Sequence, residues 1–376
     1  MKKTLWMLGV AVAALTSCTE SEVLDVPESK MIGFDTFVDK PTRALGSDVN
    51  TANLNGFYVY GAYGTGAIDV INNFTVVDND YLNGLKVYKD GSDWKYDYQP
   101  WIANNIFRFA AYVDGETDAN NTVTKGKLND VTFIPKLEQE KLTAYGVDNG
   151  NLGSWGLEFE NYEVSNKDLL VSVPFSVDPG NLSVAPAKVN VTFKHMLAKV
   201  VFEFSKSGIT TEKLSIEPFS FDAKYIGDCL VHFGEKPDPN SVGGRLTDPH
   251  IHWKSEDIEK TYEVFPKEGE NNQSWNTGTI SQEFYVLPQS NENLVLTNFK
   301  IYVHKGSGEE VVKTFVMNNV SLKITDHTQW LPGQIYRYYA DVTPGAYNIV
   351  FSASVDSWSD TANRDQNIST TPTPNP

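Results

Sequence analysis

The sequence predicts an all-β protein with two domains. Apolar and polar residues alternate with period two in many segments, whereas helical periodicity is weak. Aromatic residues are abundant, with 18 Tyr and 20 Phe among 376 residues, and aromatic side chains favour strands. Gly, Pro, Asn and Asp separate the alternating segments, as turns between strands require. The length allows two ordinary domains.

The composition limits the partners. A hydrophobic fraction of 40% with 21% charged residues is typical of a folded chain and not of a disordered one. The formal net charge is -17, which disfavours binding to nucleic acid or to anionic membrane surfaces, because both repel an acidic protein. Solubility is a sufficient explanation for this charge.

The N-terminal segment predicts export. Lys2 and Lys3 precede an apolar run over residues 5–15, which is too short to span a bilayer and is typical of a signal peptide. The run ends in Leu-Thr-Ser before Cys18, and this sequence resembles the bacterial lipobox, whose cysteine takes a diacylglyceryl group. The alternative is an ordinary signal peptide followed by an unrelated cysteine. Residues 1–18 are interpreted as a lipoprotein signal peptide.

Two features follow the signal peptide. Residues 32–38 form a strand-like stretch whose apolar members include Ile32, Phe34, Phe37 and Val38. Arg43 and Ala44 then form a candidate protease site, which must lie in an exposed loop to be cut.

The first half of the body continues the alternating pattern. Trp94, Tyr96 and Tyr98 are expected on one face of a strand, because alternate residues of a strand share a face. Strands are predicted at residues 57–63, 94–98, 106–113 and 168–173.

A Pro- and Gly-containing segment at residues 178–186 predicts a linker between two domains. Beyond it, residues 189–193 and 200–204 alternate with opposite parity, which predicts one strand with a bulge or bend near residues 195–198. Further strands are predicted at residues 214–221, 284–287, 294–303, 311–316, 335–342 and 347–355. A loop is predicted at residues 237–249.

No catalytic, metal or cofactor site is predicted. His250 and His252 would point the same way on a strand, as two metal ligands could, but no third ligand has the spacing to complete a site. Exposed loop histidines are the simpler interpretation. His195 is expected in the core or at its rim, and Cys229 as a small buried apolar residue. A calcium loop or a solvated acidic turn are the two interpretations of Asp114, Glu116, Asp118 and Asn120.

Several motifs together resemble the fimbrillin family of pilus-subunit lipoprotein precursors in gut and oral Gram-negative bacteria. They follow in order over nearly the whole chain, from the lipobox at Cys18 and the stretch before Arg43 onward. The most family-like run covers residues 191–200, and later matches include residues 286–289, 330–336 and 355–358.

The resemblance implies two tandem transthyretin-like β-sandwiches, an outer-membrane lipoprotein precursor, and cleavage after Arg43 by an arginine-specific or trypsin-like protease. The strand at residues 32–38 would then leave, and a strand from a neighbouring subunit would replace it in a cell-surface fimbrium. The predicted divisions are a signal peptide at 1–18, a propeptide at 19–43, sandwiches at 44–180 and 185–358, and a flexible tail at 359–376.

The C-terminal region offers a candidate donor strand. Its alternating apolar residues are Ile349, Phe351, Ala353 and Val355, whereas the last residues hold three prolines and would pair poorly. A tip or minor subunit that accepts a strand and donates none is therefore the alternative to a shaft subunit.

Three functions remain open from the sequence. The leading one is a fimbrial subunit or tip adhesin, with other subunits as partners and an unassigned surface receptor. The second is a monomeric glycan-binding surface lipoprotein that stacks its aromatic residues on sugars. The third is an unrecognised hydrolase, since 48 acidic residues allow many carboxylate pairs.

Overall fold

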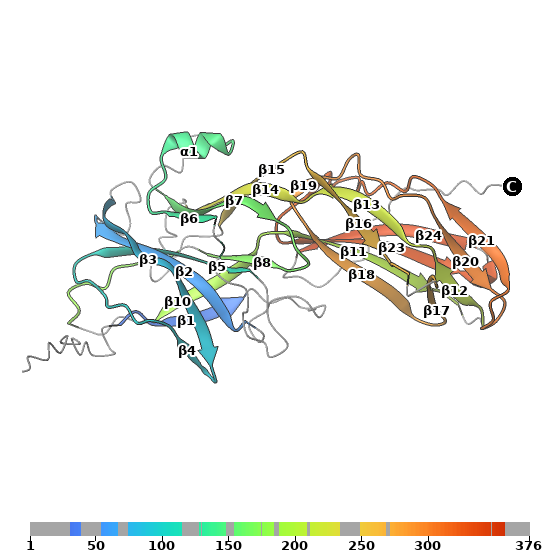
Figure 1. Cartoon of the computed structure of the whole chain (residues 1–376), viewed down its shortest axis with the longest axis horizontal. Coiled ribbons are helices and arrows are strands. Elements are labelled where there is room, and N and C mark those ends of the chain that lie inside the picture. Colours follow the sequence, from blue (N-terminus) through green and yellow to red (C-terminus); the bar gives the residue numbers. More distant parts are fainter. Residues whose placement is uncertain are drawn as a thin grey trace, which may run out of the picture.

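The computed structural model is built almost entirely of strands, which confirms the predicted all-β class (Figure 1). It describes residues 31–38, 54–66, 74–114, 128, 130–147, 154–173, 175–183, 188–208, 211–233, 249–267, 271–346 and 348–357. Its helix α1 (Gln139–Ala144) has six residues. Among the residues so described, no helix has the length and apolar character needed to cross a membrane.

An eight-stranded sheet organises what we call the first lobe. Its strands run in the order β1-β10-β8-β5-β2-β3-β4, and β9 pairs with β5 beside this path. Alternation explains its burial: Phe57 and Val59 of β2 face one side of the sheet, and Tyr58 and Tyr60 face the other. The strands are β1 (Phe34–Val38), β2 (Gly56–Thr65), β3 (Thr75–Asp90), β4 (Asp93–Lys95), β5 (Ile106–Asp114), β8 (Leu169–Ser172), β9 (Phe175–Val177) and β10 (Val189–His195).

A second sheet covers one face of the first. It has the order β15-β14-β7-β6, and an apolar cluster with Tyr112, Trp155 and Phe159 fills the space between the two sheets. The other face of the eight-stranded sheet carries a separate cluster that includes Phe107, Phe109 and Trp101. The strands of this second sheet are β6 (Val131–Ile134), β7 (Trp155–Glu163), β14 (Ile226–Phe233) and β15 (His250–Ser255).

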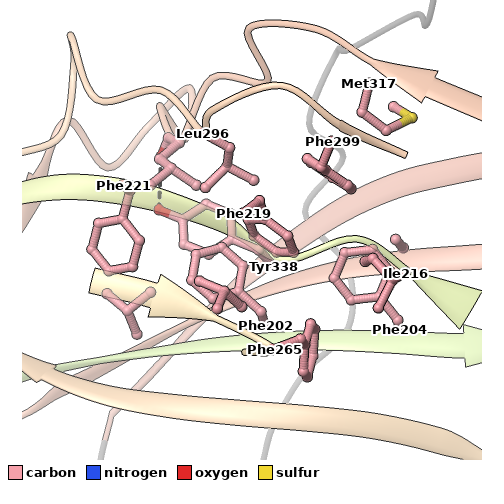
Figure 2. Packing of buried hydrophobic residues seen from close by; sticks show 14 of the residues in the cluster. Phe202, Phe204, Ile216, Phe219, Phe221, Phe265, Leu296, Phe299, Met317 and Tyr338 are labelled. Carbon is pink, nitrogen blue, oxygen red and sulfur yellow. Dashed lines mark hydrogen bonds between the residues drawn. The ribbon is translucent and has the colours of Figure 1, made fainter. Parts of the chain in front are cut away.

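Two four-stranded sheets form what we call the second lobe, in the orders β18-β11-β23-β24 and β17-β12-β20-β21. Figure 2 shows their aromatic core, in which Phe219 stacks on Phe299 with ring centroids 4.3 Å apart. Small pairs β13-β16 and β19-β22 complete it. The strands are β11 (Ala198–Lys206), β12 (Lys213–Ile216), β13 (Phe219–Lys224), β16 (Glu259–Val264), β17 (Gln273–Trp275), β18 (Thr279–Val286), β19 (Gln289–Ser290), β20 (Phe299–His304), β21 (Val311–Met317), β22 (Gln329–Trp330), β23 (Gln334–Thr343) and β24 (Asn348–Ser357).

The chain passes between the lobes several times. Strand β10 pairs with β1 and β8 in the first lobe, and β11 then pairs with β18 and β23 in the second. The hairpin β14-β15 returns to pair with β7. The strand pairings therefore place residues 189–195, 226–233 and 250–255 with the first lobe, whereas the sequence predicted that residues 185–358 form a separate sandwich.

The change of parity after His195 has a different cause from the predicted bulge. Strand β10 ends at His195 and β11 begins at Ala198, so these are two strands in two sheets. Met196 and Leu197 between them are fully buried in the cluster between the sheets of the first lobe. The parity changes because the chain crosses from one lobe to the other at this point.

Candidate functional site

Strand β1 forms one end of the eight-stranded sheet. It runs parallel to β10, with Phe34 opposite Val189 and Val38 opposite Phe193. The backbone N–H of Val189 donates to the carbonyl of Gly33 at 2.7 Å. As an edge strand, β1 pairs with one neighbour in the sheet, so its removal leaves the backbone groups of β10 open to a new strand.

The side chains of the β1 segment complete an apolar core. Ile32 and Phe34 are 1% and 2% exposed and belong to the buried cluster on the face of the sheet opposite the second sheet. The Phe34 ring makes edge contacts with Tyr96, Phe57 and Phe109, with ring centroids 5.3, 6.0 and 6.4 Å away. Burial of two such side chains contributes about 3–6 kcal/mol of apolar stabilisation.

A loop after β4 holds the segment from its other side. The N–H of Ile32 donates to the carbonyl of Gln99 at 2.9 Å, and the Tyr96 hydroxyl donates to the carbonyl of Ile32. Burial raises the pKa of Tyr96 to about 12, so this hydroxyl is a donor at neutral pH. The alternation of Trp94, Tyr96 and Tyr98 predicts a strand here, but it does not reveal this contact of Tyr96.

The structure describes the four predicted residues of the removable strand, but not the predicted lipidation and cleavage sites. Ile32 and Phe34 are core residues, and Phe37 and Val38 lie within β1, opposite Thr192 and Phe193. The predicted lipidation site Cys18 and the predicted cleavage site at Arg43 and Ala44 lie outside the described residues.

The candidate donor residues lie on β24, which forms one end of its sheet. This strand pairs antiparallel with β23 over ten residue pairs. Ile349 and Ala353 are buried in the core of the second lobe, and Phe351 and Val355 are half-buried against it. All four side chains therefore pack in the lobe to which β24 belongs. If β24 is donated to another subunit, another strand must fill the place that these side chains leave.

Cys229 and His195 are buried, and the candidate calcium loop is described only at its first residue. Cys229 is buried in the first lobe, and burial raises the pKa of its thiol, so it behaves as an apolar core residue. His195 is buried, with its Nδ1 2.7 Å from Asp168 Oδ2. Asp114 ends β5, whereas the other three residues of the candidate calcium loop lie outside the described part of the chain. Within the described ranges, no group of three or more His, Cys, Asp or Glu could hold a metal ion.

The chain is similar to one protein family and to several solved structures. A family model described as fimbrillin-like matches residues 42–358. No curated protein matches the chain. Among solved structures, a fimbrial protein from Bacteroides vulgatus is 15% identical with a TM-score of 0.46, covering 87% of this chain and 99% of that chain.

Two further solved structures are similar over most of their length. A protein provisionally described as a cell adhesion protein from Bacteroides uniformis is 12% identical with a TM-score of 0.40, covering 88% of this chain and 99% of that one. The fimbrial anchor protein Mfa2 from Porphyromonas gingivalis is 10% identical with a TM-score of 0.27, covering 87% of this chain and 98% of that one.

Proposed function

Because the chain belongs to the fimbrillin-like family, we propose that it is a fimbrial subunit or tip adhesin that mediates cell adhesion and assembles by strand exchange. The observation that carries this proposal is the position of β1. It lies before Arg43 in the sequence, at the edge of a sheet, with Ile32 and Phe34 in the core. A single cut after Arg43 separates this strand covalently from the fold that it completes.

Maturation proceeds in three steps. Lipidated Cys18 holds the precursor at the outer membrane, and a trypsin-like protease then cuts between Arg43 and Ala44. Departure of β1 exposes the open edge of β10 and an apolar groove that includes Phe57 and Phe109. An exposed edge beside an apolar face is the surface to which an added strand binds.

The donor is β24 of a neighbouring subunit. Its apolar residues alternate, as the groove requires, because successive side chains of a strand face opposite ways. Donation from the second lobe of one subunit to the first lobe of the next is head-to-tail, so it does not close on itself and builds a filament. The partners are other fimbrial subunits, the mature protein acts at the cell surface, and its role is structural and not catalytic.

Substitution of the cleavage residue tests the maturation step. The Arg43→Ala precursor is expected to fold and to resist cleavage at this position, with Lys40→Ala as the matched control that leaves Arg43 in place. Trypsin treatment of the wild-type precursor should give a chain that begins at Ala44 and forms ladders on gels. Normal surface filaments in the Arg43→Ala strain would refute cleavage as the trigger.

A peptide tests the groove directly. A synthetic peptide of residues 31–38 should bind the cleaved chain and slow its polymerisation, because it restores β1. The same peptide with Phe34→Ala should bind at least about tenfold more weakly, since it loses a buried ring worth about 1.5–3 kcal/mol. Equal inhibition by both peptides would show that the Phe34 pocket does not guide strand entry.

A second candidate function is the binding of a glycan. A polar hollow of ≈ 700 Å³ lies in the second lobe against β12, β17 and β20. Ser215, Gln273 and Tyr302 line it, together with Asn271 and Asn272, and such hydroxyl and amide groups suit sugar hydroxyls. Glycan-array binding by the uncut monomer, lost in Tyr302→Ala, would favour this function; binding that Tyr302→Ala retains would count against it.

A further inference from the structure

Strand β24 repeats the sequence pattern of strand β1 and the residues just before it. An isoleucine followed two positions later by a phenylalanine occurs in the whole sequence only at residues 32–34 and 349–351. Four positions after each phenylalanine stands a valine, Val38 or Val355, and the position midway between holds a small residue, Thr36 or Ala353. Alternate residues of a strand share a face, so the same series of side-chain types recurs in the same order along both strands.

Both strands lie at the end of a sheet, but in different lobes. β1 ends the eight-stranded sheet of the first lobe, and β24 ends a four-stranded sheet of the second (Figure 1). Phe34 is 2% exposed in its place, whereas Phe351 is only half-buried in its own lobe. The place of Phe34 therefore offers Phe351 more complete burial than it has in β24, which favours its transfer.

We propose that β24 of a second copy of this chain enters the groove parallel to β10, with Ile349 in the place of Ile32 and Phe351 in the place of Phe34. The assignment rests on the proposed strand exchange, to which it adds the direction and the register of the donor. In the precursor, β1 and the residues before it then occupy the donor's place with side chains of the same types. Cleavage exchanges one isoleucine and one phenylalanine for another such pair.

The sizes of the side chains set the direction of entry. The ring of Phe34 makes edge contacts with three aromatic rings, so its place is large and enclosed. Parallel entry fills it with another phenylalanine. Antiparallel entry with Val355 in the place of Ile32 would put Ala353 in the place of Phe34 and leave a cavity, which is destabilising.

The neighbouring positions tolerate the exchange. Val350 takes the place of Gly33, where an added Cβ would lie 3.0 Å from Lys188 Cγ, so the lysine must shift by a few tenths of an ångström. The Lys188 side chain is 67% exposed and has room to do so. Ser352 takes the place of Asp35 and loses its 3.7 Å ion pair with Lys188, which contributes little because it is exposed.

The loop after β4 accepts either sequence. The N–H of Ile32 donates to the carbonyl of Gln99 at 2.9 Å, and the carbonyl of Ile32 accepts from the Tyr96 hydroxyl. Both contacts use backbone groups of the strand, so Ile349 makes them equally well in the same place. The backbone contacts thus supply affinity, and the places of the two apolar side chains supply specificity.

Paired cysteines test the register in the filament. By the register of β1 on β10, Ser352 of the donor stands opposite Asn190, and Ser354 opposite Thr192. Opposite residues of adjacent strands have Cα atoms about 4.8 Å apart, within reach of a disulfide, whereas an offset of two residues separates them by about 8 Å, which is too far. The cleaved chains Asn190→Cys/Ser352→Cys and Thr192→Cys/Ser354→Cys should therefore form covalent ladders on non-reducing gels.

The crossed pairs, Asn190→Cys/Ser354→Cys and Thr192→Cys/Ser352→Cys, are the matched controls and should form no covalent ladder. Of the native cysteines, Cys229 is buried, and Cys18 lies before the cleavage site. Filaments that sediment but stay unlinked in both matched pairs would overturn the register and leave strand exchange standing. A link in the Ser352 pair alone would overturn the parallel direction, and absence of filaments from the wild type would overturn both proposals.

Peptide competition tests the same assignment without altering the protein. A peptide of residues 348–357 should bind the freshly cleaved chain and compete with the peptide of residues 31–38. Its Phe351→Ala form should bind at least about tenfold more weakly, whereas Ser352→Ala should bind within about twofold of the unaltered peptide. Binding of the 31–38 peptide alone, or equal binding of the Phe351→Ala form, would overturn the assignment and leave the groove as proposed.

Discussion

Substitution of Phe34 by alanine should destabilise the precursor and leave the cleaved protein unaffected. The side chain is 2% exposed and contacts three aromatic rings within 6.4 Å. Truncation of a buried Phe to Ala costs about 3–5 kcal/mol, and an edge strand that relaxes into the gap favours the lower end. We therefore expect the free energy of unfolding of the precursor to fall by about 3 kcal/mol.

Urea unfolding followed by tryptophan fluorescence measures this change. Trp94 is a local reporter, because its ring centroid lies 5.4 Å from that of Phe57, which also contacts Phe34. The measurement is made on the precursor and on the cleaved chain after the released segment is removed. The cleaved wild type and the cleaved variant have the same sequence, so a difference between them would expose incomplete removal.

Asp35→Ala provides the matched control. Asp35 neighbours Phe34 but is exposed, and its carboxylate lies 3.7 Å from Lys188 Nζ. An exposed ion pair of this kind contributes at most about 1 kcal/mol. The reasoning is refuted if Phe34→Ala leaves the unfolding midpoint of the precursor unchanged, or changes it no more than Asp35→Ala does.

Two further predictions concern other parts of the fold. Tyr338→Phe should cost about 1–3 kcal/mol at neutral pH, because Trp330 Nε1 loses its acceptor at 3.2 Å and the Leu322 carbonyl its donor at 2.7 Å. Burial raises the pKa of the Tyr338 hydroxyl, so just above pH 10 only the unfolded chain loses this proton. The free energy of unfolding of the wild type therefore falls by up to about 1.4 kcal/mol per pH unit in this range. Urea unfolding as a function of pH should show a shallower fall in Tyr338→Phe, which lacks the titrating group. Gly156→Ala should cost about 1–3 kcal/mol in the same assay, because its Cβ would stand 2.2 Å from the Val231 carbonyl oxygen; an unchanged midpoint would contradict the β7-β14 register.

Local patterns predicted the strands but not their partners. The apolar, aromatic-rich composition of residues 106–113 and 335–342 is a local property, and β5 and β23 lie there. The predicted strand at residues 214–221 is in fact two strands, β12 and β13, which belong to different sheets. Nothing in a strand's own sequence states which sheet it joins, because that depends on the surfaces it meets across the fold.

The sequence likewise predicted the residues of the candidate site but not their contacts. The apolar character of Ile32 and Phe34 and their distance from Arg43 are visible in the sequence. Their anchoring by the loop at residues 96–99 and the parallel pairing with β10 are contacts between distant segments, which one sequence does not encode in a readable pattern. For the same reason, the sequence does not reveal that His232 lies opposite His250.

The pairing of the β14-β15 hairpin with β7 constrains the order in which the first lobe can fold. A chain is synthesised from its N-terminus, so β7 is complete about 60 residues before β14, the strand that pairs with one of its edges. The first lobe cannot reach its final packing until residue 255 has followed. Until then the apolar face that carries Trp155 and Phe159 lacks part of its cover, so a partly folded chain exposes apolar surface.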